Sequence, residues 1–172
     1  MSRHDRYPDA LIRNILEKTR TIAIVGASAN VIRPSYFVLK YLIAKGYVVH
    51  PINPGQAGGE ILGRPVHARL ADVPEPIDIV EVFRPSEAAP GIVEDALELS
   101  PRPKVIWMQL SVRNDEAAAR AETEGLTVIM NRCPKIEYGR LCGENSWAGI
   151  NSGRFSSRVA PVDRDKRLTE NI

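Results

Sequence analysis

A short run of small residues follows the first apolar segment of the chain, in the order Gly26-Ala27-Ser28. Further along, an Arg33-Pro34-Ser35 step stands where a helix is expected to begin, because proline suits the first helical turn. Gly26 allows a tight turn, the Ser28 hydroxyl can donate to an anion, and Arg33 supplies positive charge. Since free N–H groups at a helix N-terminus attract anions, this arrangement predicts a phosphate-binding loop.

The loop departs from the standard dinucleotide-binding motif. The pattern G-x-G-x-x-G needs glycines where this chain has Ser28 and Val31. An NAD site also normally has an acidic residue at the end of the second strand, where this chain has Asn53 followed by Pro54. The sequence therefore argues against NAD. The Asn53-Pro54 turn is expected either to form a wall for an adenosine or simply to make a rigid Asx-type turn.

Other candidate residues follow later apolar runs. Arg84 can contact a phosphate and Phe83 can stack on a base, although a phenylalanine at this position is equally at home in a core. Gln109 ends an apolar run, so its amide needs a partner, either the backbone or a ligand. Cys133 precedes Pro134 and follows Arg132; an adjacent arginine favours a thiolate, whereas a lone cysteine is often a small buried hydrophobe.

The elements that must position these residues alternate along the chain. Nearly continuous apolar runs predict strands buried on both faces, at residues 21–25, 47–52, 77–83, 105–110 and 127–130. Helical patterns lie at residues 8–18, 35–45, 89–99 and 114–124, with a short helix starting at Pro134 and one short edge strand near Val66. The alternation predicts an α/β fold: a Rossmann-like, doubly wound parallel sheet in a single three-layer domain.

In such a sheet the ligand crevice lies outside the carboxyl ends of the strands, where the strand order reverses. The candidate residues all follow predicted strands. We therefore expect one rim to gather Gly26, Ala27, Ser28, Arg33, Pro34, Ser35, Asn53, Pro54, Phe83, Arg84, Gln109, Cys133 and Pro134.

Composition excludes several classes of function. The 23 Lys and Arg against 21 Asp and Glu give a net charge of +2, so no broad basic field for nucleic acid is expected. No apolar run is long enough for a membrane span and no signal-peptide core is visible, which predicts a cytoplasmic protein. Two cysteines and three scattered histidines suggest free thiols and no metal site, and no Ser/His/Asp set for hydrolysis can be assembled.

Several motifs together resemble one family. They are Val25-Gly26-Ala27-Ser28, Arg33-Pro34-Ser35, the segment 46–54, Ile61-Leu62-Gly63, the segment 78–84, Trp107-Met108-Gln109-Leu110 and the segment 131–137. In this order they resemble the small stand-alone CoA-binding proteins of bacteria and archaea, which are related to the CoA-binding domain of the succinyl-CoA synthetase alpha subunit.

The resemblance implies a Rossmann-like domain that binds coenzyme A or an acyl-CoA. It places the CoA phosphates near Gly26, Ser28, Arg33 and Ser35, and the adenosine beside Asn53 and Pro54, with Phe83 and Arg84 lining the same groove. The expected organisation is an N-terminal helix at residues 1–18, the CoA-binding domain at 19–143 and a C-terminal extension at 144–172. In the ligases, catalysis depends on a phosphorylated histidine in a following domain, so we expect a carrier, sensor or detached ligase module without catalysis of its own.

Two alternatives stay open at this point. One is an NAD(P)-dependent oxidoreductase with a divergent phosphate loop, against which the missing acid at Asn53 stands. The other is a redox protein in which Cys133 forms a mixed disulfide with CoA. Protein partners are not predicted by the sequence.

Overall fold

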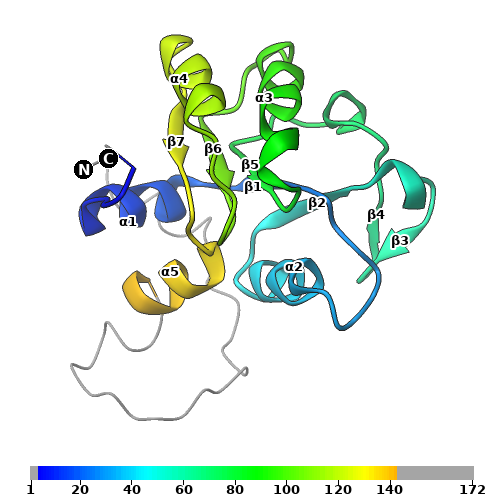
Figure 1. Cartoon of the computed structure of the whole chain (residues 1–172). Coiled ribbons are helices and arrows are strands. Elements are labelled where there is room, and N and C mark those ends of the chain that lie inside the picture. The colour runs from blue at the N-terminus through cyan, green and yellow to red at the C-terminus, as the bar shows by residue number, and fades with distance from the viewer. Residues whose placement is uncertain (1–3, 143–172) are drawn as a thin grey trace, which may run out of the picture.

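The computed structural model describes residues 4–142, and a five-stranded sheet forms its centre (Figure 1). All strand pairs in this sheet are parallel, and the strand order is β2-β1-β5-β6-β7. The strands are β1 (Thr21–Val25), β2 (Val48–Ile52), β5 (Ile79–Val82), β6 (Val105–Met108) and β7 (Thr127–Ile129). The predicted Rossmann-like α/β fold is thereby confirmed.

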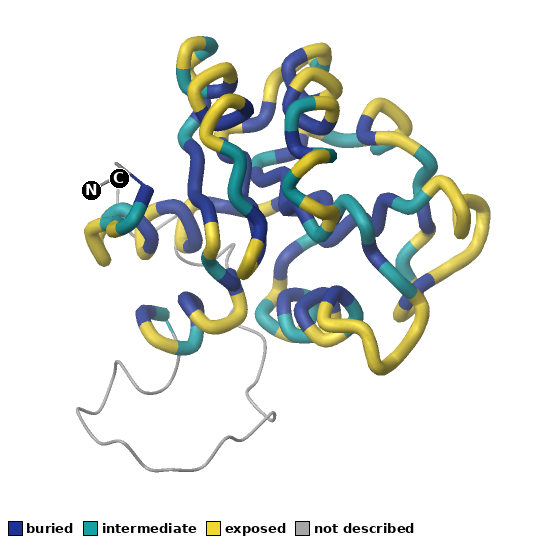
Figure 2. The backbone as a smooth tube through the Cα atoms, in the orientation of Figure 1, coloured by how far each residue is buried: buried dark blue, intermediate teal, exposed yellow. Residues whose placement is uncertain are grey.

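Helices cover both faces of the sheet, which gives three layers (Figure 1). One face packs on α1 (Asp9–Lys18), α2 (Pro34–Ala44) and α5 (Pro134–Leu141), and the other packs on α3 (Ala89–Leu97) and α4 (Asp115–Thr123). Side chains alternate along each strand: Ile22 and Ile24 face the first set of helices, and Ala23 between them faces the second. Figure 2 shows the resulting pattern, with buried strands between helices whose outer faces are exposed.

The segment between β2 and β5 is more structured than the sequence indicated. Its short antiparallel pair, β3 (Glu60–Ile61) and β4 (Arg64–Pro65), ends just before Val66, where the sequence predicted a single edge strand. Short 3-10 helices flank the pair, η1 (Pro54–Gln56) and η2 (Leu70–Asp72). His67 then forms an isolated parallel bridge with Ile52, which holds this segment against the edge strand β2.

Several predicted elements are shorter in the structure by one or two residues at an end. Strand β6 ends at Met108, before Gln109 and Leu110, because the chain turns there. The Val112 N–H donates to the Gln109 carbonyl at 2.9 Å, and Ser111 takes a φ of 67°. Strand β5 likewise ends at Val82, and a 3-10 turn, η3 (Ser86–Ala88), leads into α3.

The helix α1 packs on the core. Its Ile12, Ile15 and Leu16 are buried, and Asp9 forms an ion pair with Arg140 of α5 at 2.8 Å. The division of the chain at residues 18 and 143 stays a prediction, and the proposed extension at 144–172 lies outside the described residues. None of the helices between residues 4 and 142 is long and apolar enough to cross a membrane.

Candidate functional site

The strand order reverses between β1 and β5, and a cavity of about 440 Å³ opens beside their carboxyl ends. The connection after β1 runs through α2 on one face, and the connection after β5 runs through α3 on the other, so the two loops diverge and leave a crevice. The cavity is lined by Val25, Gly26, Ile52, Asn53, Pro54, Gly55, Ala68, Arg69, Leu70, Arg84, Ala88, Ile92 and Asp95. Four of these, Gly26, Asn53, Pro54 and Arg84, were predicted from the sequence.

Gly26 is required at the end of β1 for two physical reasons. Its φ is +91°, in the region that side chains disfavour, and a Cβ built on it would lie 2.9 Å from the Phe83 carbonyl oxygen. The same Cβ would lie 3.0 Å from Cδ of Arg84. The loop after β1 therefore passes directly against the end of β5, with the Arg84 side chain beside it.

The rest of this loop is held by local hydrogen bonds. The Ser28 hydroxyl oxygen accepts from the Asn30 N–H at 3.1 Å, and the Ala29 N–H donates to Gln56 of η1 at 3.0 Å. The Ser28 hydroxyl hydrogen is left available to donate to a ligand. The loop leads to α2, whose first helical residue is Pro34, with Arg33 exposed just before it and Ser35 buried in its first turn.

The first turn of α2 has the character of an anion site. It contains no acidic residue and lies at the positive end of the helix dipole. Pro34 has no N–H and the Tyr36 N–H donates to the Arg33 carbonyl at 3.0 Å, so the Ser35 N–H is the backbone donor that this turn can offer to an anion. Arg33 and Arg84 are both exposed at this end of the sheet. The structure thus brings a helix N-terminus and two guanidinium groups to the carboxyl ends of β1 and β5.

Asn53 serves as a clamp, and its amide is used within the protein. Its Nδ2 donates to the Ala27 carbonyl at 2.7 Å, and its Oδ1 accepts from the Gly55 N–H at 2.9 Å. This geometry is the Asx-type turn considered in the sequence, and it fixes the phosphate loop to η1. Pro54 and Gly55 then form an exposed wall of the cavity.

The cavity has an apolar floor and a charged rim. Ile52, Leu70 and Ile92 are buried and belong to the core cluster beneath α3 and α4. On the rim, Arg69 donates to Asp72 at 3.1 Å, and this hydrogen bond lowers the pKa of the Asp72 carboxyl. Sequence reasoning missed Arg69, Leu70, Ile92 and Asp95, because their approach depends on how residues 55–71 and α3 fold over the sheet.

Gln109 and Cys133 lie on the opposite face, together with a residue that the sequence analysis did not select, Glu81. Gln109 Nε2 donates to Glu81 Oε1 at 3.0 Å, and the Gln109 side chain also lies near the Cys133 thiol, whose pKa it lowers. Glu81 is 0% exposed, and burial raises its pKa to about 8, with the Gln109 hydrogen bond opposing the shift. The signal in the sequence that could have revealed Glu81 is its position as a charged residue inside the apolar run 77–83.

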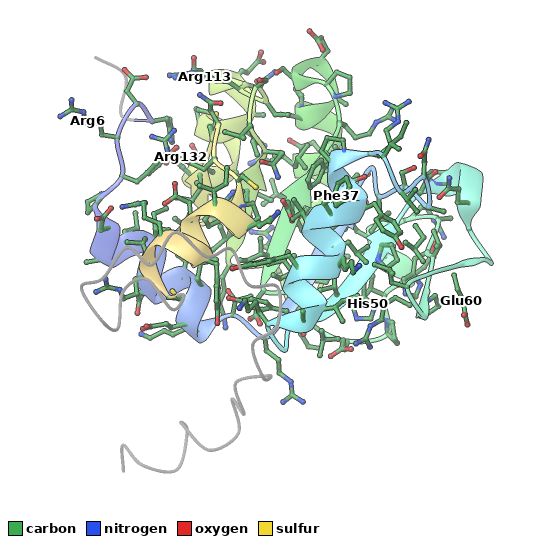
Figure 3. All side chains as sticks on the ribbon, turned by 90° about the horizontal axis from the view of Figure 1, so that it is seen from below. Arg6, Phe37, His50, Glu60, Arg113 and Arg132 are labelled. Atoms are coloured by element: carbon green, nitrogen blue, oxygen red, sulfur yellow. The ribbon has the colours of Figure 1, made fainter. Side chains whose placement is uncertain are left out.

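The Cys133 thiol is less acidic than its neighbours in sequence suggested. Burial raises its pKa and the nearby Glu81 adds to the shift, while N–H groups of Ile136 and Lys135 oppose it. The expected help from Arg132 is absent, because the Arg132 guanidinium donates to the Asp5 carbonyl at 3.1 Å and lies over the Tyr7 ring. Figure 3 shows Arg132 on the side of the N-terminal segment. Of the two sequence interpretations, the buried position and the raised pKa of Cys133 favour the neutral thiol.

The predicted site residues consequently divide among three places. Gly26, Asn53, Pro54 and Arg84 line the cavity. Ser28, Arg33, Pro34 and Ser35 lie along the loop and the start of α2. The remaining residues lie in or beside the core beneath α1, α2 and α5: Ala27, Phe83, Gln109, Cys133 and Pro134. Phe83 is half-buried in that core and does not line the cavity.

Two of the three histidines also come together, although they are scattered in the sequence. His50 Nδ1 lies 3.3 Å from His67 Nε2, and His50 Nε2 lies 3.0 Å from a Glu75 carboxylate oxygen. Burial, followed by the effect of His50, lowers the pKa of His67. The bridge between His67 and Ile52 produces this pairing, which no spacing in the sequence revealed.

An open parallel sheet with a cavity and a helix N-terminus at the reversal of its strand order is the arrangement typical of nucleotide-binding proteins of the α/β class. Comparison with known families makes the assignment more specific, since the model of the CoA binding domain family matches residues 20–139. The chain belongs to this family.

Relatives of similar size cover most of the chain. The Bacillus subtilis protein YneT is 39% identical over 129 residues, which are 75% of this chain and 93% of YneT. A hypothetical protein from Pyrococcus horikoshii has a solved structure with a TM-score of 0.77 and 36% identity, covering 83% of this chain and 98% of that one. These similarities agree with the fold described above.

Larger relatives contain the domain as one part. The alpha subunit of the ADP-forming acetate–CoA ligase I of Pyrococcus furiosus is 29% identical over 80 residues, which are 44% of this chain and 17% of that subunit. An acetyl-coenzyme A synthetase from Candidatus Korarchaeum cryptofilum has a TM-score of 0.53 and 25% identity, covering 63% of this chain and 25% of that one. The domain is thus related to part of the acetyl-CoA synthetases.

Proposed function

We propose that the protein binds coenzyme A or an acyl-CoA at the carboxyl ends of β1 and β5. The observation that carries this proposal is the cavity beside Gly26, which an apolar floor and two arginines, Arg69 and Arg84, make suitable for a nucleotide. The adenosine would occupy this cavity against Pro54, and the phosphates would lie between Arg84, Arg33 and the N-terminus of α2. Membership of the CoA binding domain family supports this choice of ligand.

The phosphate end of the proposed site depends on close backbone packing at Gly26 and on hydrogen-bond donors, one of them charged. Gly26 lets the loop pass directly against the end of β5 and keeps Arg84 beside it, since a Cβ would meet the Phe83 carbonyl. The Ser28 hydroxyl and the Ser35 N–H in the first turn of α2 supply neutral donors, and Arg33 supplies a charged one. Hydrogen bonds between a guanidinium and a phosphate are among the stronger ones in proteins.

NAD(P) is a poorer candidate on structural grounds. A ribose-binding acid would have to stand where Asn53 lies, but the Asn53 amide is already bonded to Ala27 and Gly55. No residue at the end of β2 therefore replaces the missing acid. The oxidoreductase alternative receives no support from this position.

For the biological role, we propose a cytoplasmic carrier, sensor or separate ligase module without catalysis of its own. Protein isolated without added ligand is expected to carry CoA or an acyl-CoA, which mass spectrometry of the denatured sample identifies. Acetyl-CoA or a longer thioester in that sample would favour a carrier, and free CoA would favour a sensor.

Titration calorimetry tests the ligand directly. CoA, dephospho-CoA, NAD and NADP are titrated into the same preparation, and CoA is expected to give the tightest binding. Absence of heat with CoA at millimolar concentration would overturn the proposal. Tighter binding of NAD or NADP than of CoA would favour the oxidoreductase instead.

A further inference from the structure

A buried carboxyl oxygen without a hydrogen-bond partner lies on the face of the sheet opposite the cavity. Among residues 4–142, Glu81 Oε2 is the buried side-chain oxygen or nitrogen that accepts or donates no hydrogen bond. Leaving a buried polar group unsatisfied costs about 1–3 kcal/mol, and a burden of this kind in a well-packed core calls for an explanation other than stability. A free carboxyl oxygen is suited to accept or return a proton.

The cluster of side chains around Glu81 contains a nucleophile, the thiol of Cys133. Glu81 lies on β5 in register with Trp107 of β6, so its side chain faces the helices α2 and α5. Gln109 Nε2 donates to Glu81 Oε1 at 3.0 Å, and both Gln109 and Glu81 lie near enough to shift the pKa of the Cys133 thiol. Cys133 is the residue directly before α5, so a carboxyl, an amide and a thiol meet at the carboxyl edge of the sheet.

This group is within reach of a ligand whose phosphates lie beside Gly26. Neighbouring strands are about 4.8 Å apart, so the order β1-β5-β6-β7 puts the ends of β1 and β7 about 14 Å apart. Apolar side chains line the same edge: Phe37 on α2, Leu110 after β6 and Ile136 on α5 are 51%, 49% and 55% exposed. Phe37 stands on the exposed side of α2 in Figure 3. The flexible pantetheine arm of CoA, which carries two amides and a dimethyl group, can follow this edge toward Cys133.

We propose that Glu81, Gln109 and Cys133 form a thiol-exchange site that takes the disulfide form of CoA. The inference rests on the proposed function, because the nucleotide portion of CoA would hold the reactive disulfide near the thiol. Glu81 and Cys133 carry the chemistry, and Gln109 is a positioning residue.

The reaction balances in one exchange. Cys133 Sγ attacks one sulfur of the CoA disulfide while its proton passes to the ionised Glu81 carboxylate. The Cys133–S–S–CoA bond forms and the original S–S bond breaks. The departing CoA thiolate then takes the proton from Glu81 and leaves as free CoA thiol. The Cys133 sulfur is oxidised and one CoA sulfur is reduced, and the disulfide itself is the oxidant.

The burial of the group gives the exchange its selectivity. Cys133 is 7% exposed, so a dissolved disulfide meets it rarely, whereas a bound one is held beside it. Burial raises the pKa of both the Cys133 thiol and the Glu81 carboxyl. A carboxyl of ordinary acidity would be a weak base toward such a thiol, and the raised proton affinity of Glu81 makes the transfer easier.

Intact-protein mass spectrometry after incubation with CoA disulfide tests the inference. The wild type is expected to gain the mass of one CoA less two hydrogens. Cys142→Ser is the matched control and should form the same adduct, whereas Cys133→Ser and Cys133→Ala should form none. Glu81→Gln should slow the reaction at least tenfold and leave the calorimetric affinity for CoA unchanged.

Pantethine, a disulfide without the nucleotide, provides the second comparison and should react at least tenfold more slowly than CoA disulfide. An adduct on Cys142, equal rates in the wild type and Glu81→Gln, or equal rates with pantethine would each overturn the inference. CoA binding by calorimetry without an adduct would also overturn it and would leave the proposed function intact. Absence of CoA binding would overturn both.

Discussion

The cavity beside Gly26 and the buried group around Glu81 lie at the same edge of one sheet but on opposite faces, and they treat charge differently. In the cavity, Arg69 and Arg84 stand on an exposed rim above an apolar floor. On the other face, Glu81 and Cys133 are buried, and burial raises the pKa of both so that their neutral forms are favoured.

The difference follows from the cost of removing charge from water. An exposed guanidinium keeps its hydration until a ligand replaces the water. Positive charge at the rim therefore costs little desolvation free energy. A buried carboxyl lacks that hydration and instead holds its proton. The first region is therefore equipped to bind an anion, and the second is equipped to hold and release protons.

The largest predicted effect belongs to the buried group and depends on pH. The folded protein favours protonated Glu81, whereas the unfolded chain ionises near the ordinary value of 4.5. The stabilising contribution is therefore complete below pH 4.5 and is lost as the pH rises to about 8. Glu81→Gln mimics the protonated form, so the wild type should lose stability relative to this variant by up to about 1.4 kcal/mol per pH unit in that window.

Denaturant unfolding of both proteins from pH 4.5 to 8 measures this difference, because the other titrating groups cancel in the comparison. Parallel stability curves for the two proteins would show that Glu81 is ionised in the fold at neutral pH. That result would remove the contrast between the two regions.

The next effect concerns the close packing of the loop after β1 against the end of β5, at Gly26. Gly26→Ala should cost about 3 kcal/mol of stability and abolish CoA binding, because the new Cβ is strained at φ +91° and meets the Phe83 carbonyl at 2.9 Å. Gly125→Ala is the matched control: its φ is +85°, but nothing lies within 4 Å of the new Cβ. It should cost about 1 kcal/mol and leave binding unchanged. Equal losses in both variants would refute the close approach.

The arginines at the cavity and loop come third. Arg84→Ala and Arg33→Ala should each weaken CoA binding by about 2 kcal/mol with little change in stability, since each removes a charge-assisted contact to phosphate. Arg6→Ala removes an exposed arginine of the N-terminal segment and serves as control. Calorimetry at two salt concentrations measures the effect, and wild-type affinity in both site variants would place the phosphates elsewhere.

The smallest effect is expected at the clamp. Asn53→Ala removes the hydrogen bonds to Ala27 and Gly55 from a partly exposed turn, which should cost about 1 kcal/mol of stability. CoA binding should weaken only modestly, because Asn53 positions the loop and need not contact the ligand through its amide. A loss of affinity larger than that of Arg84→Ala would instead make the amide a direct ligand contact.

Much of the fold was available from the sequence for local reasons. Continuous apolar runs marked the five strands. Gly46 and Gly125 follow the ends of α2 and α4 with φ values of +86° and +85°, as glycine favours at helix ends. The ends of β1 and β2 were placed correctly, whereas those of β5, β6 and β7 were placed one or two residues too late. At Gln109 and Leu110 the reason is the turn at Ser111, which is closed by the hydrogen bond from the Val112 N–H to the Gln109 carbonyl.

The sequence by itself determined the alternation of strands and helices, the family, and the part of the site that follows strand ends, namely the loop after Gly26 and Arg84. These features depend on residue types and spacing along the chain. Only the tertiary structure decided that Arg69 and Asp95 join the cavity, that Phe83 packs into the core, and that Glu81 meets Cys133. The physical reason is that burial and hydrogen-bond partners come from distant segments, and these determine whether a side chain is charged, neutral or reactive.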